Sequence, residues 1–109
     1  MKIREAIEND FEQILPLLEE LLERPTDNRE ELREIFLKGL RSEVRAIFVA
    51  ELEGKIRGLI TLSLYYKEAF YADCTIADID EFIVAGDARG SGMADHLMES
   101  ALQYARERG

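Results

Sequence analysis

Hydrophobic and polar residues alternate along the chain with two different periods. Residues 3–7 alternate weakly at every second position, which predicts a short strand. Residues 11–22 and 32–40 instead repeat apolar side chains every three or four positions, which predicts two amphipathic helices. Pro16 lies inside the first helical pattern. Because proline lacks the N–H group that would bond back one turn, we expect a kink or an early 3₁₀ turn there.

Short polar signals mark where these helices begin. Asn9 with Glu12, and Asn28 with Glu31, have the spacing of a capping box, in which side chains satisfy free backbone N–H groups of the first turn. We therefore expect two separate helices, the second of which ends near residues 39–42.

The rest of the chain predicts three strands and one more helix. Residues 44–52 and 56–66 are rich in β-branched and aromatic side chains, and Glu53-Gly54 between them is typical of a hairpin turn. Residues 75–84 form another strand, and the apolar residues of 94–105 repeat with the period of a helix. The order β-α-α-β-β-β-α predicts an α/β fold with a mainly antiparallel sheet.

The length and the net charge limit the number of domains and the kinds of partner that this chain can have. The 109 residues suit a single domain over residues 1–109. The 23 acidic and 14 basic residues give a net charge of −9, which argues against nucleic acids and anionic membrane surfaces as partners. The N-terminal segment lacks an apolar signal core, and the longest apolar run, 46–50, is too short to cross a bilayer. We therefore expect a cytoplasmic protein.

Cysteine and histidine are each used once, at Cys74 and His96. A single cysteine excludes an intrachain disulfide and a zinc cluster built from thiolates. Any metal site would rest on carboxylates alone, so none is expected. We expect His96 to lie on the surface of the last helix, and Cys74 to be a small buried or loop thiol without a neighbour that would activate it.

The informative segment is Arg89-Gly90-Ser91-Gly92-Met93-Ala94, which follows an apolar strand and opens the last helix. A helix N-terminus carries unpaired N–H groups and the positive end of the helix dipole, so it attracts anions. The glycines let the backbone approach an anion, and Arg89 can add a charged contact. The segment predicts a pyrophosphate site, with a tight structural turn as the alternative. It is neither a P-loop nor a dinucleotide-binding fingerprint, because the Lys-Ser/Thr pair and the third glycine are absent.

The same six residues resemble the R/Q-x-x-G-x-G/A motif of the GNAT superfamily of acyl-CoA-dependent N-acetyltransferases. Asp80-Glu81-Phe82-Ile83-Val84 is similar to the acidic and then apolar fourth strand of that family. The preceding strand, two helices and hairpin also resemble the family. The resemblance implies a domain that binds acetyl-CoA and transfers its acetyl group to a primary amine, by direct attack in a ternary complex.

The resemblance also implies roles for individual residues. The backbone N–H groups of the glycine loop would bind the CoA pyrophosphate, with Arg89 opening the loop. The backbone of Ile83 and Val84 would pair with the pantetheine arm like an additional strand. The alternatives are a structural turn for the loop and a purely core role for the two strand residues. The loop residues in question are Gly90, Ser91, Gly92, Met93 and Ala94.

Asp80 and Glu81 are the candidate general bases. Amine acetylation needs a neutral nucleophile, so a carboxylate has to accept the ammonium proton, directly or through water. Side chains alternate along a strand, so we expect only one of the two to face the cleft, with Asp78 on the same side as Asp80. The alternative is that these carboxylates are merely solvated.

The stretch around residues 68–88 suggests the kind of acceptor. It holds six acidic side chains and no Lys or Arg, which favours a cationic amine beside the reaction centre, with a solvated acidic face as the alternative. Nearby aromatic residues would line an acceptor pocket or form a hairpin core. They are Tyr65, Tyr66, Phe70 and Tyr71.

One departure from the family concerns the C-terminus. The family continues after this helix with a further strand, helix and closing hairpin, which supply a tyrosine used as general acid, whereas this sequence ends at Gly109. We expect a C-terminally shortened domain, and the alternative function is a non-catalytic domain that binds CoA or a partner chain. The strand 75–84 would have at most one strand partner within the chain. We therefore expect a homodimer in which a second copy covers its other edge.

Overall fold

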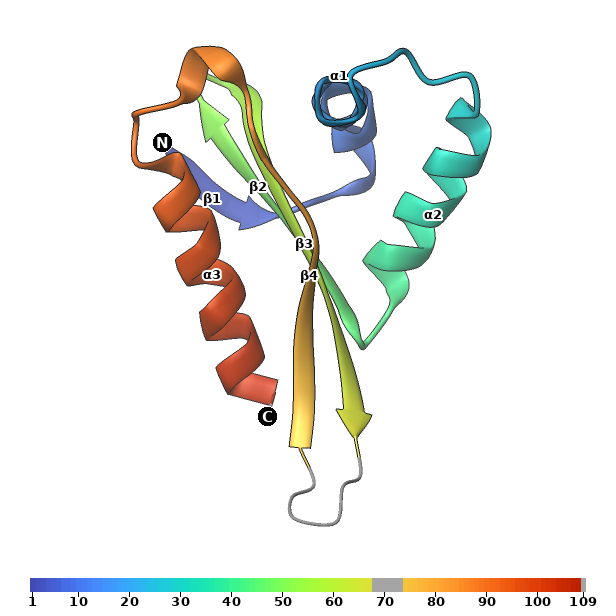
Figure 1. Ribbon diagram of the computed structural model, residues 1–109, viewed down its shortest axis with the longest axis vertical. Helices are drawn as coiled ribbons and strands as arrows, with labels where there is room; N and C mark the ends of the chain where they lie inside the picture. The colour runs from blue at the N-terminus through green and yellow to red at the C-terminus, as the bar shows by residue number, and fades with distance from the viewer. Residues whose placement is uncertain (68–73, 109) are drawn as a thin grey trace.

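One antiparallel sheet with helices on both faces makes up the computed structural model, which describes residues 1–67 and 74–108 (Figure 1). The elements in chain order are β1 (Lys2–Glu5), α1 (Phe11–Leu22), α2 (Arg29–Arg41), β2 (Arg45–Leu52), β3 (Lys55–Lys67), β4 (Cys74–Val84) and α3 (Met93–Arg108). Two 3₁₀ turns, η1 (Glu8–Asp10) and η2 (Gly86–Ala88), precede α1 and α3. The predicted element order and the α/β fold class are confirmed.

The sheet has the strand order β1-β2-β3-β4, and every neighbouring pair is antiparallel. Glu53 and Gly54 have φ values of 54° and 78°, so they form the left-handed turn that matches the twist of a tight hairpin. The predicted hairpin turn is therefore confirmed. Among the described residues β4 pairs with β3 alone, as expected for the strand at this edge.

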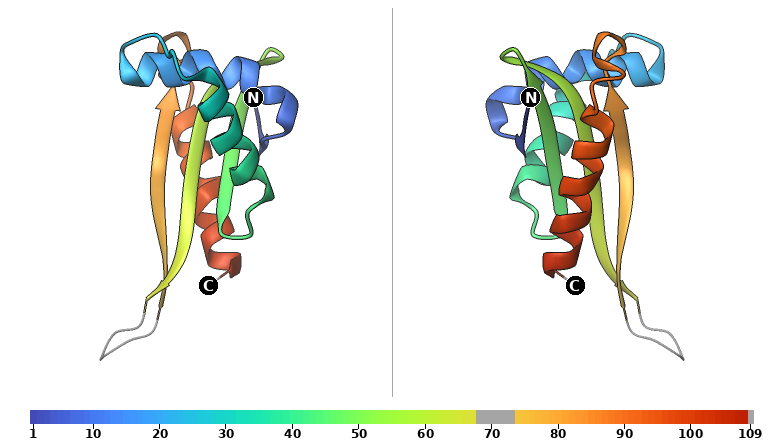
Figure 2. Two further views of the ribbon diagram at one scale, coloured as in Figure 1. Left: turned by 90° about the vertical axis from the view of Figure 1, so that its right-hand side faces the viewer. Right: turned by 90° about the vertical axis from the view of Figure 1, so that its left-hand side faces the viewer.

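The helices cover opposite faces of the sheet (Figures 1 and 2). We call the side covered by α1 and α2 the helix-pair face, and the other side the α3 face. The buried core of the helix-pair face includes Phe11, Ile14, Leu17, Phe36, Val49, Leu59 and Ile83. The buried core of the α3 face includes Ala50, Ile60, Leu62, Met93, Leu97 and Ala101. Alternate residues of the strands thus supply two separate cores.

The closest approach between a helix and the sheet lies at Gly58 of β3. A Cβ atom at this position would lie 2.7 Å from the Met93 sulfur and 2.8 Å from Cδ1 of Leu97. Both neighbours are fully buried, so neither has free space to move into. Glycine at this position is therefore what allows α3 to pack against β3.

An ionic network joins β1 to the beginning of α1. The Arg4 guanidinium donates to both carboxylate oxygens of Asp10, at 2.8 and 2.9 Å, and to Glu51 of β2 at 2.6 Å. The Ile7 N–H also donates to Asp10, at 2.7 Å. Asp10 is only 4% exposed. The hydrogen bonds from Arg4 lower the pKa of Asp10 most strongly; burial opposes this shift, and the Ile7 N–H adds to it.

This network corrects the predicted start of the first helix. Asp10, rather than Asn9, is the N-cap residue of α1, and no side chain caps the helix there. The strand predicted to reach Ile7 ends at Glu5, because the chain turns into η1 once Asp10 accepts the Ile7 N–H. Asn28 is the N-cap of α2 as predicted, but its side chain makes no capping hydrogen bond.

The 3₁₀ turn expected at Pro16 is not found there: Pro16 lies within the α-helix α1, and the 3₁₀ turn η1 ends at Asp10, before that helix begins. Pro16 points toward solvent, while the core contacts of α1 come from its neighbours Ile14, Leu15 and Leu17. No helix in the described ranges is long and apolar enough to cross a membrane.

Candidate functional site

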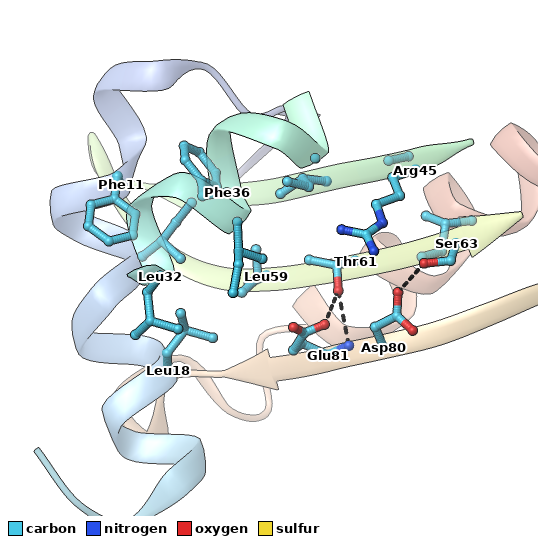
Figure 3. A pocket seen from close by; sticks show the side chains of 16 residues that line it. Phe11, Leu18, Leu32, Phe36, Arg45, Leu59, Thr61, Ser63, Asp80 and Glu81 are labelled. Atoms are coloured by element: carbon cyan, nitrogen blue, oxygen red, sulfur yellow. Dashed lines mark hydrogen bonds between the residues drawn. The ribbon is translucent and has the colours of Figure 1, made fainter. Parts of the chain in front are cut away.

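A β-bulge in β4 determines how the two candidate bases are presented. Thr61 of β3 pairs with Glu81, whereas the next residue, Leu62, pairs with Ile79, so Asp80 is an extra residue in β4. A bulge of this kind breaks the strict alternation of side chains. Asp80 and Glu81 both line the helix-pair face (Figure 3). The expectation that only one of them faces the cleft is therefore wrong, because it assumed a regular strand.

Two hydroxyl groups of β3 hold these carboxylates. The Ser63 hydroxyl donates to Asp80, and the Thr61 hydroxyl donates to Glu81 (Figure 3). The Thr61 hydroxyl also accepts the Glu81 backbone N–H at 3.0 Å. Sequence reasoning missed both residues. The sequence does carry a signal for them: Thr61 and Ser63 are two positions apart in one strand, so their hydroxyl groups lie on the same face of the sheet.

The carboxylates stand at one end of a cavity of about 270 Å³ between the helix pair and the sheet (Figure 3). The other end is apolar and is lined by Phe11, Ile14, Leu18, Leu32, Ile35 and Phe36. Arg45 of β2 lines the same end of the cavity and was not among the predicted site residues (Figure 3). The cavity therefore combines an apolar half with a half that carries both signs of charge.

The glycine loop joins the end of β4 to α3. Gly90 and Gly92 have φ values of 84° and 85°, a left-handed conformation that favours glycine. The first helical bond runs from the His96 N–H to the Gly92 carbonyl at 3.2 Å. The N–H groups of Met93 and Ala94 precede that bond, so the helix offers them no partner. A Cβ at Gly90 would meet nothing within 4 Å.

Ser91 is held within the loop. Its hydroxyl donates to the Ala88 carbonyl at 2.6 Å, and its N–H donates to the same carbonyl at 3.4 Å. The Met93 side chain is fully buried in the core of the α3 face. Met93 can therefore serve a ligand only through its backbone, while its side chain fixes the start of the helix on the sheet.

Two cavities meet at this loop. One, of about 480 Å³, is lined by Ile83 and Val84 of β4, Leu21 of α1, Phe82, Glu20, Glu23, Arg89 and Ala94. The other, of about 420 Å³, is lined by Val84, Ala88, Arg89, Gly90, Gly92, Met93, Ala94 and Asp95. The predicted cofactor residues thus come together at one end of β4. The buried Ile83 side chain also belongs to the core of the helix-pair face.

The charges around the loop are mixed. Arg89 is 70% exposed and lies 3.7 Å from the carboxylate of Glu20, which projects from α1. Glu23 and Asp95 add negative charge to the same two cavities. An anion bound at this loop would therefore depend on backbone N–H groups and Arg89, in competition with nearby carboxylates.

Several other predicted residues take different places. Tyr65 and Tyr66 are 46% and 60% exposed, so they form no hairpin core, and neither lines the charged cavity. Phe70 and Tyr71 lie outside the described residues. His96 is exposed on α3, as expected. The aromatic lining of the cavity comes instead from Phe11 and Phe36, whose ring centroids are 5.7 Å apart.

Comparisons with known proteins agree with this geometry. A sequence profile of the acetyltransferase (GNAT) family matches residues 5–109. The chain matches no curated protein significantly. Among solved structures, an acetyltransferase from Vibrio fischeri is 23% identical with a TM-score of 0.82, over 100% of this chain and 89% of that one.

Two similar structures are aminoglycoside acetyltransferases. One comes from an uncultured soil metagenomic sample and was solved in complex with sisomicin; it is 28% identical with a TM-score of 0.75, over 99% of this chain and 71% of that one. The other is an aminoglycoside antibiotic 6'-N-acetyltransferase from Acinetobacter haemolyticus, which is 17% identical with a TM-score of 0.82, over 98% and 72% of the two chains.

Proposed function

Because the chain belongs to the acetyltransferase (GNAT) family, we propose that it transfers an acetyl group from acetyl-CoA to a primary amine. The observation that carries the proposal is the organisation of β4. This strand presents Asp80 and Glu81 at its bulge and leads through η2 into the glycine loop. A donor bound at the loop and along the strand would therefore reach the two carboxylates.

The loop suits the pyrophosphate of CoA. The left-handed glycines leave open space where side chains would stand, and the backbone N–H groups at the start of α3 are available as donors. We assign the pyrophosphate to the backbone of Gly90, Gly92, Met93 and Ala94, with Arg89 beside it. Ser91 contributes by holding the loop against Ala88.

The pantetheine arm is assigned to the free edge of β4. Among the described residues no strand pairs with β4 on the side away from β3. Backbone groups point to the two edges of a strand in turn, and the Ala85 N–H bonds to the Arg57 carbonyl beside β3, so the N–H and C=O groups of Val84 face the free edge and those of Ile83 face β3. The pantetheine arm would therefore pair with Val84 and lie alongside Ile83. Their side chains meanwhile face the cores, so binding and packing use different atoms of the same residues.

We assign removal of the ammonium proton of the acceptor to the carboxylates of Asp80 and Glu81. Acetyl-CoA supplies the acetyl group as a thioester. Glu81 or Asp80 accepts a proton from the ammonium group, directly or through water, so that the nitrogen lone pair becomes available. In the overall exchange the nitrogen–carbon bond forms and the carbon–sulfur bond breaks. The amine gives up two protons, one of which ends on the CoA thiol and the other in solvent.

Calorimetric titration with acetyl-CoA and a thiol-release assay over a panel of amines test this function. Aminoglycosides belong on the panel because of the two similar enzymes. Binding with thiol release supports the transferase, binding without release with any amine favours the non-catalytic alternative, and absence of binding contradicts both. Gly92→Asp should abolish binding, because it places a carboxylate against the pyrophosphate. Gly54→Asp is the matched control, with a similar positive φ but outside both cavities.

Glu81→Gln and Asp80→Asn separate catalysis from binding. Loss of the general base should lower kcat by about 100-fold or more, while acetyl-CoA binding stays intact. If neither variant changes the rate, another group or solvent removes the proton.

We further propose that a second copy covers part of the free edge of β4, on the side of the bulge away from the backbone assigned to the pantetheine arm. In the described ranges this part of the edge carries unpaired backbone groups beside the exposed Ile79. The carboxylates of Asp78 and Asp80 would repel those of a second copy and so disfavour pairing along the whole strand. We therefore expect the two copies to contact each other toward the Thr75 end of β4. Light scattering tests this proposal, since a monomer of 12.5 kDa at micromolar concentration contradicts it.

The cytoplasmic location expected from the sequence stays a prediction.

A further inference from the structure

Side chains of three neighbouring strands build the charged half of the cavity on the helix-pair face. Arg45 of β2 pairs with Ser63 of β3, whose hydroxyl donates to Asp80 of β4. One step along the sheet, Thr61 of β3 donates to Glu81. Adjacent strands lie about 4.8 Å apart, so the backbones of β2 and β4 are separated by about 10 Å across β3. The long arginine side chain spans much of that gap.

Arg45 is left available because hydroxyl groups, and not the guanidinium, hold the carboxylates. Figure 3 shows Arg45 extending over β3 toward Thr61 and Ser63, while the hydrogen bonds drawn to Asp80 and Glu81 come from those hydroxyls. In the described part of the chain, Arg45 is not in an ion pair with any carboxylate. A guanidinium beside a cavity is a good partner for a carboxylate of a ligand, because its fork matches the two oxygens.

The opposite half of the cavity is apolar. It is lined by Phe11 and Leu18 of α1 and by Leu32, Ile35 and Phe36 of α2. Ile35 is 55% exposed, so an apolar surface stands open at this wall. A polyamine or another fully polar acceptor would leave this surface in contact with water, whereas an aliphatic or aromatic side chain would cover it.

The size of the cavity restricts the acceptor further. Its volume of about 270 Å³ falls just below the range of small-molecule sites, about 300–1,000 Å³. An acceptor of amino-acid size suits this space better than a drug-sized polycation.

We propose that the acceptor is a free α-amino acid with an aliphatic or aromatic side chain, and that Arg45 is the residue that selects it. Its ammonium group lies toward Asp80 and Glu81, its carboxylate pairs with Arg45, and its side chain enters the apolar half. An α-amino acid suits the site because it carries an ammonium and a carboxylate on one carbon. This inference rests on the proposed acetyltransferase function and adds the acceptor class to it.

Matched acceptors test the three contacts separately. L-leucine carries the ammonium group, the carboxylate and the large apolar side chain. L-leucinamide lacks the charged carboxylate, and L-alanine lacks the large side chain. Spermidine is a polyamine that has neither a carboxylate nor an apolar side chain. Thiol release with acetyl-CoA should give a kcat/KM for L-leucine at least about 10-fold above that of each of the other three compounds. Titration of the same compounds into the chain saturated with CoA gives a readout that does not need turnover.

Arg45→Gln tests the selecting residue. The ratio of L-leucine to L-leucinamide, in kcat/KM or in affinity, should fall about 10-fold or more, and Arg45→Lys should restore part of it. Arg41→Gln, an exposed arginine on α2 outside the cavity lining, should leave the ratio unchanged. Taking a ratio removes general losses of folding, which circular dichroism checks independently.

The outcomes distinguish this inference from the proposed function. If acetyl-CoA does not bind, the proposed function fails. If acetyl-CoA binds and spermidine or L-leucinamide is preferred to L-leucine, the amino-acid assignment is overturned while the transferase stands. An unchanged ratio in Arg45→Gln, or no binding of L-leucine to the CoA-saturated chain, also overturns the assignment.

Discussion

The two faces of the sheet hold their helices by different chemistry. On the α3 face, Gly58 lets Met93 and Leu97 pack directly onto β3, and the contact is apolar. On the helix-pair face, α1 is fixed at its beginning by the ion pairs of Arg4 with Asp10 and Glu51. The cavity of about 270 Å³ that holds the candidate bases lies on this second face.

The difference shows how this small domain accommodates a site. A cavity between a helix pair and a sheet removes apolar contacts that would otherwise hold the layers together. Directional bonds at the edge of that layer keep α1 in position where packing is incomplete. We therefore expect the helix-pair face to depend on charge and pH, and the α3 face to depend on side-chain volume.

The largest expected effect is the loss of Asp10. Asp10→Ala removes one partner of Arg4 and leaves the Ile7 N–H without its acceptor, so the free energy of unfolding should fall by about 3 kcal/mol. Urea denaturation measures the change. The control is Asp87→Ala, which breaks the exposed pair with Arg57 at 3.0 Å and should cost less than about 1 kcal/mol. Equal losses in the two variants would contradict a special role for the network.

The same network gives the chain a pH dependence. The hydrogen bonds from Arg4 lower the pKa of Asp10 in the folded state, whereas an unfolded aspartate titrates near about 3.9. The stabilisation is therefore fully present above the unfolded pKa and is lost as the pH falls through the folded pKa. Unfolding measured from about pH 6 down to pH 3 should show stability decreasing at the acid end. Asp10→Asn should flatten this decrease, and parallel curves for the two proteins would rule the network out as its source.

The elements of the fold were predictable because each one repeats its own period in the sequence. The apolar positions of β2 and of α2 are set by strand and helix geometry, and both elements appear within about one or two residues of their expected ends. The network around Arg4 was not predictable in this way. Its partner Glu51 lies 47 residues further along the chain, and no local pattern specifies that contact.

The candidate site was predictable in part for the same reason. The glycine loop is a continuous segment with its own local signal, so its residues could be named from the sequence. The bulge at Asp80 has no such signal, since it arises from how β4 aligns with Thr61 and Leu62 of β3. Arg45 joins the site through pairing between strands, which spacing along one strand does not reveal.

Close packing on the α3 face should appear as sensitivity to a single methyl group. Gly58→Ala places Cβ within 2.8 Å of two buried side chains, so it should cost about 1–3 kcal/mol despite the better strand propensity of alanine. The control is Gly86→Ala, where the nearest atom would lie 3.7 Å away and a change below about 1 kcal/mol is expected. Thermal unfolding of both variants, at neutral pH, measures the difference. A tolerated Gly58→Ala would show that α3 can shift outward without loss.

The smallest expected effect concerns Glu20, which reaches from the helix-pair face to the glycine loop. Its carboxylate lies 3.7 Å from the Arg89 guanidinium and so competes with any anion that Arg89 would hold. Glu20→Gln should tighten the binding of acetyl-CoA by about two- to five-fold, a small gain because both side chains are well exposed. The gain should shrink in high salt, because screening weakens the competing pair. Calorimetric titration at low and high salt measures it, with Glu34→Gln on the exposed side of α2 as the control for net charge. Weaker binding in Glu20→Gln would mean that Glu20 positions Arg89 for the anion and does not compete with it.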